Sequence, residues 1–370
     1  MRYYFKIGNL TVLIEYNREQ YCAYFEKEFG LLHVSEGELT ASRADICVTI
    51  QETPIRFLSE MKKVSKGFWQ CESFLLQQLV AFRRKTWIKY NSLNNIELIV
   101  TYPCNEPIEK LFNPFFECRS IACLHDFFHN PFLLILQLNM LKLNSALFHS
   151  SSLVKRNEEI YLFTGEGQSG KSSLLKLLLD NYNSSFSAED FSFVCSDGSV
   201  FGYPHMCRVK DKDFFRQIMT KSTINTIFDK LNYFAFHKVL RVGNGRHFSV
   251  SDYFSGKSFQ ERGNSGYVFE LDRKCSEFSC EIQDLDSFVE RQISVINNEF
   301  SNMVSVVDLA DVLHKNGFVV YSFDDMINQI RQIYYTCFAK FKGLFILHLP
   351  FYSHIDEAAD KLLTIVREKE

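Results

Sequence analysis

The chain has 370 residues, a formal net charge of −3, 46% hydrophobic residues and 23% charged residues. This composition is typical of a globular protein with one large domain or two to three ordinary ones. The near-neutral charge, without a long Lys/Arg run, gives no electrostatic reason to expect nucleic acid binding. No signal peptide is predicted, because the first residues lack a sustained apolar run. No membrane span is predicted, because the best candidate stretch, 131–148, is interrupted by polar residues. We therefore expect a cytoplasmic protein that binds neither nucleic acid nor membrane.

Metal-binding motifs are absent from the local sequence. The eleven cysteines are scattered, and their closest pairs do not match a zinc-binding spacing. His125 and His129 stand one helical turn apart, but no third ligand completes an H-E-x-x-H frame around them. The sequence therefore favours a packed helix face at these histidines over a metal site.

The first part of the chain, 1–143, predicts a separate α+β region that binds a substrate or a partner. Short β-rich runs at 3–7, 11–15, 44–50, 87–90 and 96–102 predict strands. From 108 to about 143 the apolar residues recur with a helical period. The sequence leaves self-association of the protein open.

The second part, 144–370, is organised around the stretch 160–179. An apolar run at 160–163 predicts a buried strand, and a leucine-rich helix follows the pattern Gly165-x-x-x-x-Gly170-Lys171-Ser172. This is the phosphate-binding loop (P-loop) pattern in its proper strand–loop–helix context. The candidate nucleotide-binding residues are Gly165, Glu166, Gly167, Gln168, Ser169, Gly170, Lys171, Ser172 and Ser173.

Each part of this loop has a physical role in binding a nucleotide with Mg²⁺. The glycines let backbone N–H groups approach phosphate oxygens, and the helix N-terminus adds partial positive charge. Lys171 would reach the outer phosphates, and the Ser172 hydroxyl would bind Mg²⁺. We expect Lys171 to be solvated when no nucleotide is bound. An ordinary glycine turn is the alternative.

Two carboxylates stand inside the next predicted strand, 186–194. Glu189 and Asp190 interrupt an apolar run, where unpaired charges are costly unless they bind a partner or a metal. Asp190 follows Lys171 by about twenty residues, where a P-loop enzyme needs a carboxylate for Mg²⁺. His149 lies on a predicted strand at 146–154 that pairs back onto 160–163, next to a run of three serines. A lone histidine is usually structural, but this polar patch makes His149 a candidate.

Later elements complete the predicted domain. We expect strands at 267–271, 317–323 and 343–349, and a helix over 284–300 that is capped by Asp284 or Asp286. Asp324 and Asp325 are interpreted as helix-capping residues rather than a second metal site. An arginine among Arg208, Arg241 and Arg246 is expected to neutralise phosphate charge, with a surface turn as the equal alternative for Arg241 and Arg246.

Four features in this order resemble a known family. They are His149 with its serines, the loop 165–173, the acidic pair Glu189-Asp190 and the segment 197–204. Together they resemble the C-terminal kinase domain of HPr kinase/phosphorylase, over about 145–210 and more loosely over 267–300. The departure is Glu189, where the family has Asp.

The resemblance implies a P-loop core of the phosphoenolpyruvate-carboxykinase type with a mixed sheet, and phosphoryl transfer to a serine-type hydroxyl. It implies that Lys171 and Ser172 serve phosphate and Mg²⁺, that Asp190 acts as metal ligand or base, and that His149 lines the active site. Relatives of this type accompany clusters that make modified peptides.

Two functions are compatible with the sequence. The first is an ATP- and Mg²⁺-dependent kinase that acts on a peptide, protein or small molecule, with Glu189 or Asp190 as the proton acceptor. The second is a nucleotide-binding scaffold or chaperone of a peptide-maturation complex, which would bind ATP without transferring phosphate.

Overall fold

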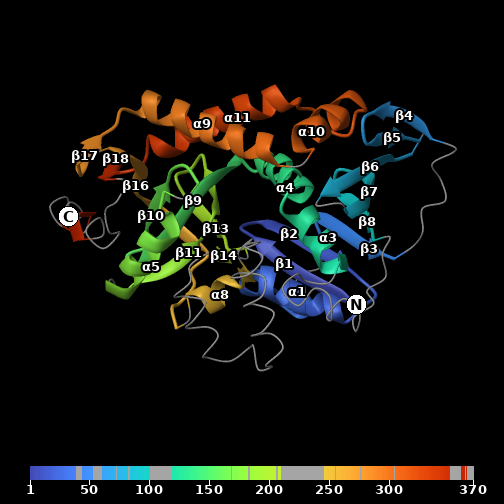
Figure 1. Ribbon diagram of the computed structural model, residues 1–370, viewed down its shortest axis with the longest axis horizontal. Helices are drawn as coiled ribbons and strands as arrows, with labels where there is room; N and C mark the ends of the chain where they lie inside the picture. Colours follow the sequence, from blue (N-terminus) through green and yellow to red (C-terminus); the bar gives the residue numbers. More distant parts are fainter. Residues whose placement is uncertain are drawn as a thin grey trace, which may run out of the picture.

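The computed structural model describes residues 1–38, 44–52, 61–71, 73–81, 84–100, 119–167, 169–181, 184–205, 207–209, 246–254, 256–275, 277–303, 305–350, 360–362 and 364. It is a mixed α/β structure with two large mixed sheets, one formed before residue 100 and one after residue 144 (Figure 1). The mixed sheet expected around the loop segment is confirmed.

The first sheet has the strand order β1-β2-β3-β8-β7-β6-β5-β4. The pairs β2–β3 and β3–β8 are parallel, and the remaining pairs, including the outermost pair β1–β2, are antiparallel. Four predicted runs, at 3–7, 11–15, 44–50 and 87–90, lie on β1, β2, β3 and β7. The bounds are Arg2–Ile7, Leu10–Glu15, Ile46–Gln51, Lys62–Ser65, Phe68–Gln70, Leu75–Ala81, Arg84–Ser92 and Asn95–Ile99 for β1 to β8.

Helix α1, Gln20–Phe29, lies between β2 and β3 in the chain, whereas α3, Arg119–Phe128, and α4, Pro131–Leu141, connect the first sheet to the second. Two short 3₁₀ turns follow α1, at Gly30–Leu32 and Glu36–Glu38. All residues of α4 are buried, because this helix contacts α3, α10, α11 and strand β9 of the second sheet. The predicted helical stretch is thus confirmed from 119 onward, and its beginning at 108–118 lies outside the described residues.

The second sheet has the order β10-β9-β12-β13-β16-β18-β17, with β11 also paired to β9 and β10 also paired to β16. The pairs β10–β16 and β16–β18 are parallel, and β9–β10 is the predicted antiparallel hairpin. A separate ribbon is formed by β14, Cys207–Val209, and β15, Arg246–Phe248. The other bounds are Ser145–Lys155, Glu159–Thr164, Ser184–Ala188, Phe191–Cys195, Val200–Tyr203, Arg262–Cys275, Ser279–Ile282 and Gly343–Pro350 for β9 to β13 and β16 to β18.

Strand β10 is buried on both faces, which explains its continuous apolar sequence. Ile160 and Leu162 join the cluster that contains helices α9 and α11, whereas Tyr161 and Phe163 join the cluster around helix α5. Alternate side chains of a strand point to opposite faces, so each face needs its own apolar residues. The loop that follows β10 is therefore fixed between two packed layers.

Helices α9, Leu285–Asn302, α10, Val306–Lys315, and α11, Phe323–Phe338, run along one side of the molecule, and α5, Lys171–Asn181, covers the opposite face of the second sheet (Figure 1). A short helix α8, Val250–Tyr253, precedes β16. Asp284 caps α9 as expected, with its carboxylate accepting from Ser287 N.

The strand predicted at 317–323 was wrong. The segment after α10 turns at Gly317, which has a φ of +74°, and leads directly into α11. No described strand pairs with it, and Val320 is 83% exposed, so an apolar run alone did not make a strand here. Ser322 is the N-cap of α11 and Asp325 completes a capping box with it, which confirms the interpretation of this acidic pair as a helix start.

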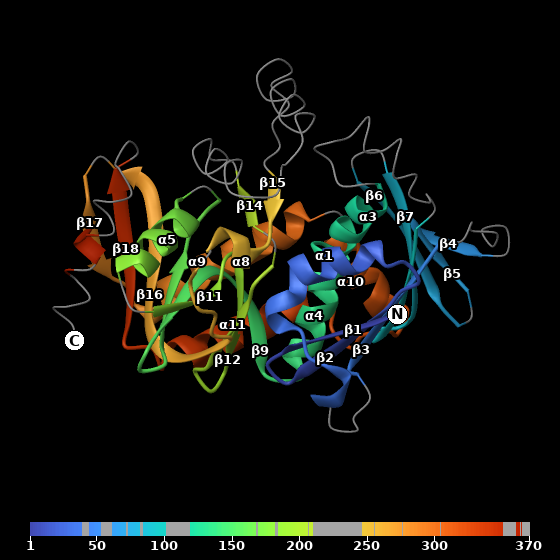
Figure 2. The same cartoon turned by 90° about the horizontal axis from the view of Figure 1, so that it is seen from below.

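One buried hydrophobic cluster extends from Tyr3 in the first sheet to Leu344 in the second. Phe5 on β1 contacts Phe132 on α4, with ring centroids 6.3 Å apart. Helix α4 lies between the first sheet and the second (Figure 1 and Figure 2). The division of the chain at 143/144 stays a prediction.

Candidate phosphate-binding site

The loop after β10 has the strand–loop–helix geometry expected from its sequence. Gly165 and Gly170 have φ values of +137° and +100°, which L-residues with a side chain rarely adopt. A Cβ at Gly165 would lie 2.6 Å from the carbonyl oxygen of Leu271 on β16. The glycine at this position is therefore required both by backbone conformation and by the close approach of β16.

The described loop residues differ in exposure. Glu166, Gly167 and Ser173 are exposed, and Ser169 is buried with a hydroxyl that has no hydrogen-bond partner among the described residues. Gln168 lies outside the described residues. An unpartnered buried hydroxyl on a loop of this type is a group that a phosphate oxygen would satisfy.

Lys171 is buried, so the expectation of a solvated lysine was wrong. Its side chain is 7% exposed, and Nζ donates to the carbonyl oxygens of Gly165 and Glu166 at 2.9 and 3.3 Å. Burial lowers the pKa of Lys171 below its ordinary value. The two loop carbonyls thus hold the ammonium group of Lys171 inside the loop.

The acidic pair lies at a break between two strands, where the sequence predicted one continuous strand. Strands β11 and β12 both pair with β9, and Glu189 and Asp190 occupy the bend between them. The backbone at the bend is fixed from β9, because Ser151 Oγ donates to Glu189 O and Ser150 N donates to Asp190 O at 3.0 Å. The run of serines beside His149 therefore anchors the bend that carries both carboxylates.

Glu189 faces the first turn of helix α5. The Ser172 hydroxyl donates a hydrogen bond to Glu189 Oε1. Loss of solvation and the neighbouring Asp190 charge raise the pKa of Glu189 to about 7, although Ser172, Lys171 and His149 oppose the shift. The structure thus brings together Ser172 and Glu189, two residues that the sequence placed in different roles.

Asp190 faces two histidines. Its Oδ1 lies 3.0 Å from His149 Nε2, and its Oδ2 lies 3.7 Å from His205 Nε2. Burial acts to raise the pKa of Asp190, but the charges of His149 and Lys171 outweigh it and hold this pKa below its usual range. The Asp190 side chain keeps 40% exposure, so it remains accessible to a ligand.

His149 is 6% exposed and paired on both sides of its ring. Its Nδ1 lies 3.3 Å from Glu299 Oε1 on α9, opposite the contact with Asp190. Burial by itself would lower the pKa of His149, but Asp190 and Glu299 raise it.

The two neighbouring carboxyl groups, Glu189 and Asp190, have pKa values that are shifted in opposite directions. Such a pair is typical of sites that need an acid and an anion side by side.

Three residues of this region had no signal in the local sequence. His205 and Glu299 reach the site from the segment after β13 and from α9, and Arg273 on β16 donates from Nε to Ser169 O at 2.7 Å. Arg273 reaches the loop because β16 runs parallel to β10 in the sheet. Only this long-range pairing could have identified it.

The arginines considered from the sequence are only partly described. The backbones of Arg208 and Arg246 lie on the paired strands β14 and β15, where Arg208 is in register with His247. Arg241 lies outside the described residues. The assignment of one of these three arginines to phosphate stays a prediction.

Comparison with known proteins gives little further guidance. No family model matches the chain, and no curated protein matches it. Among solved structures, the Hpr(Ser) kinase/phosphatase from Coxiella burnetii aligns with 42% of this chain and 92% of that chain, at 12% sequence identity and a TM-score of 0.19. With so low a TM-score, we rest no argument on this similarity.

Within the described part of the chain, none of the helices has the length and apolar character needed to cross a membrane.

Proposed function

We propose that this protein is an ATP- and Mg²⁺-dependent kinase that transfers the γ-phosphoryl group to a serine-type hydroxyl. The observation that carries the proposal is the contact between Ser172, at the start of α5, and Glu189, on the bend beside Asp190. This contact puts a phosphate-binding loop and two carboxylates with different partners at one point of the second sheet. Phosphoryl transfer needs this combination of positioning and charge neutralisation.

The residues present fit a nucleotide phosphate and a magnesium ion. The loop offers glycines at positive φ, the unpartnered Ser169 hydroxyl and the N-terminus of an eleven-residue helix. Ser172 and Asp190 offer hard oxygen donors, which Mg²⁺ prefers. The ion would supply positive charge to the phosphates, and Lys171 would add its own by turning from the loop carbonyls toward the outer phosphates.

The proposed step needs a proton acceptor for the incoming hydroxyl. The hydroxyl oxygen forms a bond to the γ-phosphorus while the bond from that phosphorus to the bridging oxygen breaks, and ADP leaves with the electron pair. The hydroxyl proton passes to the Glu189 carboxylate. Asp190 is less suited to this role because His149 favours its ionised form.

We propose further that the loop-bearing sheet is a core of the phosphoenolpyruvate-carboxykinase type. Its support is the antiparallel hairpin β9–β10 before the loop and the parallel neighbour β16, which together give a mixed sheet. A peptide or protein is the proposed acceptor, consistent with the family that the ordered motifs resemble.

The test is transfer of label from γ-labelled ATP. The protein with Mg²⁺ is incubated with arrayed peptides that contain Ser, Thr or Tyr, and with matched peptides that contain Ala in their place. We expect label in the Ser peptides, ADP in equal amount, and neither with Glu189→Gln. If the wild-type protein binds ATP but forms no more ADP than Glu189→Gln does with any of the peptides, the kinase proposal is overturned. That result would support a nucleotide-binding scaffold.

A further inference from the structure

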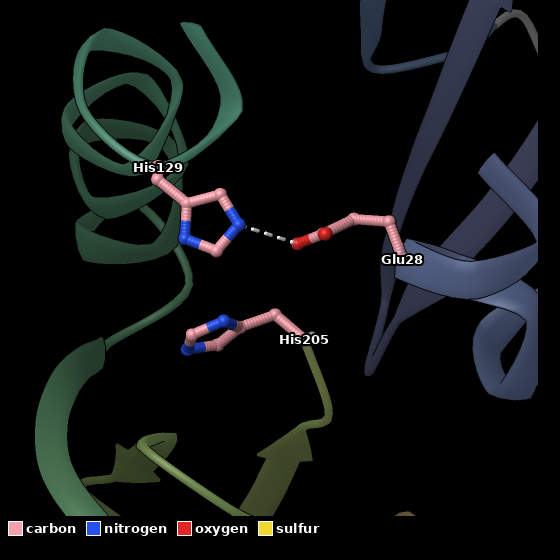
Figure 3. A group of neighbouring side chains, drawn as sticks. All are labelled: Glu28, His129 and His205. Carbon is pink, nitrogen blue, oxygen red and sulfur yellow. Dashed lines mark ion pairs between the residues drawn. The ribbon is translucent and has the colours of Figure 1, made fainter. Parts of the chain in front are cut away.

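A second group of ligand-type side chains lies beside the kinase site, in the space between the two sheets. Glu28 comes from α1, His129 follows the end of α3, and His205 stands in the segment after β13. Figure 3 shows the three side chains converging, with the His129 ring nitrogen directed at the Glu28 carboxylate and the His205 ring below both. Three segments far apart in the sequence thus place one side chain each at the same point.

These side chains are withdrawn from solvent. Glu28 is 1% exposed, His205 is 5% exposed and the His129 side chain is 18% exposed. Glu28 Oε1 lies 3.1 Å from His129 Nε2, and the His129 and His205 ring centroids are 4.8 Å apart. Neither ring nitrogen of His205 has a hydrogen-bond partner among the described residues. A buried imidazole that makes no hydrogen bond is costly, so its retention at this point needs an explanation.

We propose that Glu28, His129 and His205 bind a zinc ion. One ligand atom from each residue lies within 4.8 Å of the other two. In a filled tetrahedral centre with bonds of about 2.1 Å the ligand atoms are about 3.4 Å apart, so the rings need to close in by about an ångström. Two imidazoles and one carboxylate form a donor set that suits Zn²⁺, whereas Mg²⁺ takes oxygen ligands.

The surroundings of the cluster add to the case for such a centre. A cavity of about 230 Å³ is lined in part by Glu28 and by Pro204, the residue before His205, so open space adjoins one ligand of the cluster. On the other side, His205 Nε2 faces Asp190 Oδ2 at 3.7 Å, which leaves Nδ1 as the nitrogen for the metal. A carboxylate behind a ligating histidine is the usual support of a zinc ligand.

A zinc ion at this position would affect both the contact between the two sheets and the orientation of Asp190. It would join α1 of the first sheet to the α3–α4 connection and to the second sheet, so zinc would stabilise the contact between the two halves. Through His205 it would also fix the second oxygen of Asp190, whose first oxygen is held by His149. The metal site itself does not depend on the proposed kinase activity.

Zinc binding is tested on the full chain without nucleotide or Mg²⁺. The protein is stripped with EDTA, incubated with Zn²⁺, passed through gel filtration and analysed for metal by mass spectrometry. We expect one zinc per chain, a higher melting temperature than for the stripped protein, and with Co²⁺ the visible absorption of a tetrahedral centre. Absence of retained zinc in the folded wild-type protein would overturn the proposal.

Variants separate this site from other sources of metal binding. His205→Ala and His129→Gln should each lower zinc affinity at least tenfold, the scale on which even supporting residues act, and should lose the zinc-dependent rise in melting temperature. The controls are His125→Gln, one turn before His129, and Glu189→Gln at the proposed proton acceptor of the kinase site, and both should keep one zinc. Equal zinc retention by His205→Ala and His129→Gln would assign the metal to other residues and overturn the proposal.

Discussion

His149 and Asp190 are joined across two adjacent strands, with His149 Nε2 3.0 Å from Asp190 Oδ1. The register places His149 opposite Phe191, so its ring reaches the bend just before β12 begins. Because the histidine favours the ionised form of Asp190, the adjacent Glu189 is the carboxyl group of the pair that can take up a proton. Glu189 and Asp190 are therefore expected to respond differently to substitution.

Glu189→Gln is expected to slow phosphoryl transfer at least about a hundred-fold, the usual scale of general-base loss. The amide keeps the size of the side chain and can still accept from Ser172, so Mg²⁺–ATP binding should change little. Single-turnover transfer and calorimetry measure the two effects. Glu189→Asp, the control that keeps a carboxylate, should retain transfer, and a wild-type rate for Glu189→Gln would refute the base assignment.

The rate of transfer should rise with pH on its acidic side. A general base acts in its deprotonated form, and the pKa of Glu189 is about 7 in the protein without metal. Positive charge from Mg²⁺ nearby lowers a carboxyl pKa, so the midpoint of the acidic limb should lie at or below pH 7. A pH profile of kcat/KM measures this limb, and its persistence in Glu189→Gln would mean that another group titrates.

Asp190→Asn should weaken nucleotide binding with Mg²⁺ more than nucleotide binding in EDTA, because it removes one charged metal ligand. Calorimetry under the two conditions measures the difference. The same change removes the charge that raises the pKa of His149, so this pKa should fall, which histidine NMR can follow. An equal loss of binding with and without Mg²⁺ would instead assign Asp190 a structural role.

Lys171→Ala and Lys171→Met should both abolish transfer but differ in stability. Lys171 is buried and donates to two loop carbonyls, so both variants leave these acceptors without that donor, at a cost of about 1–3 kcal/mol. Ala also leaves a void that Met mostly fills, so the Met variant should be the more stable of the two. Denaturant unfolding measures the free energy of unfolding of the two variants. Wild-type turnover by either variant would show that the loop is not part of the catalytic site.

Gly165→Ala should destabilise the protein by about 1–3 kcal/mol and impair nucleotide binding, because it strains a residue at φ +137° and drives a Cβ against Leu271 O. The matched control is Gly167→Ala in the same loop. A Cβ at Gly167 meets nothing within 4 Å among the described residues, so this variant should fold and bind as the wild type does. Equal effects of the two substitutions would show that the close approach of β16 is unimportant.

The sequence by itself determined the local elements around the candidate site. The apolar run of β10, the glycine positions of the loop and the leucines of α5 predicted the strand–loop–helix unit, and Asp284 predicted the start of α9. These predictions hold because hydrophobic period, glycine conformation and helix capping act over a few residues, and neighbours in the chain decide them.

The tertiary structure decided what depends on distant partners. The bend at Glu189 is fixed by serines on β9, and the loop meets Leu271 and Arg273 of the distant strand β16 at Gly165 and Ser169. The run 317–322 has a strand-like composition but meets no partner strand among the described residues, so it remains a loop between two helices. Glu28, His129 and His205 lie together only because three separate segments pack there, and side-chain contacts between such segments have no counterpart in a local sequence pattern.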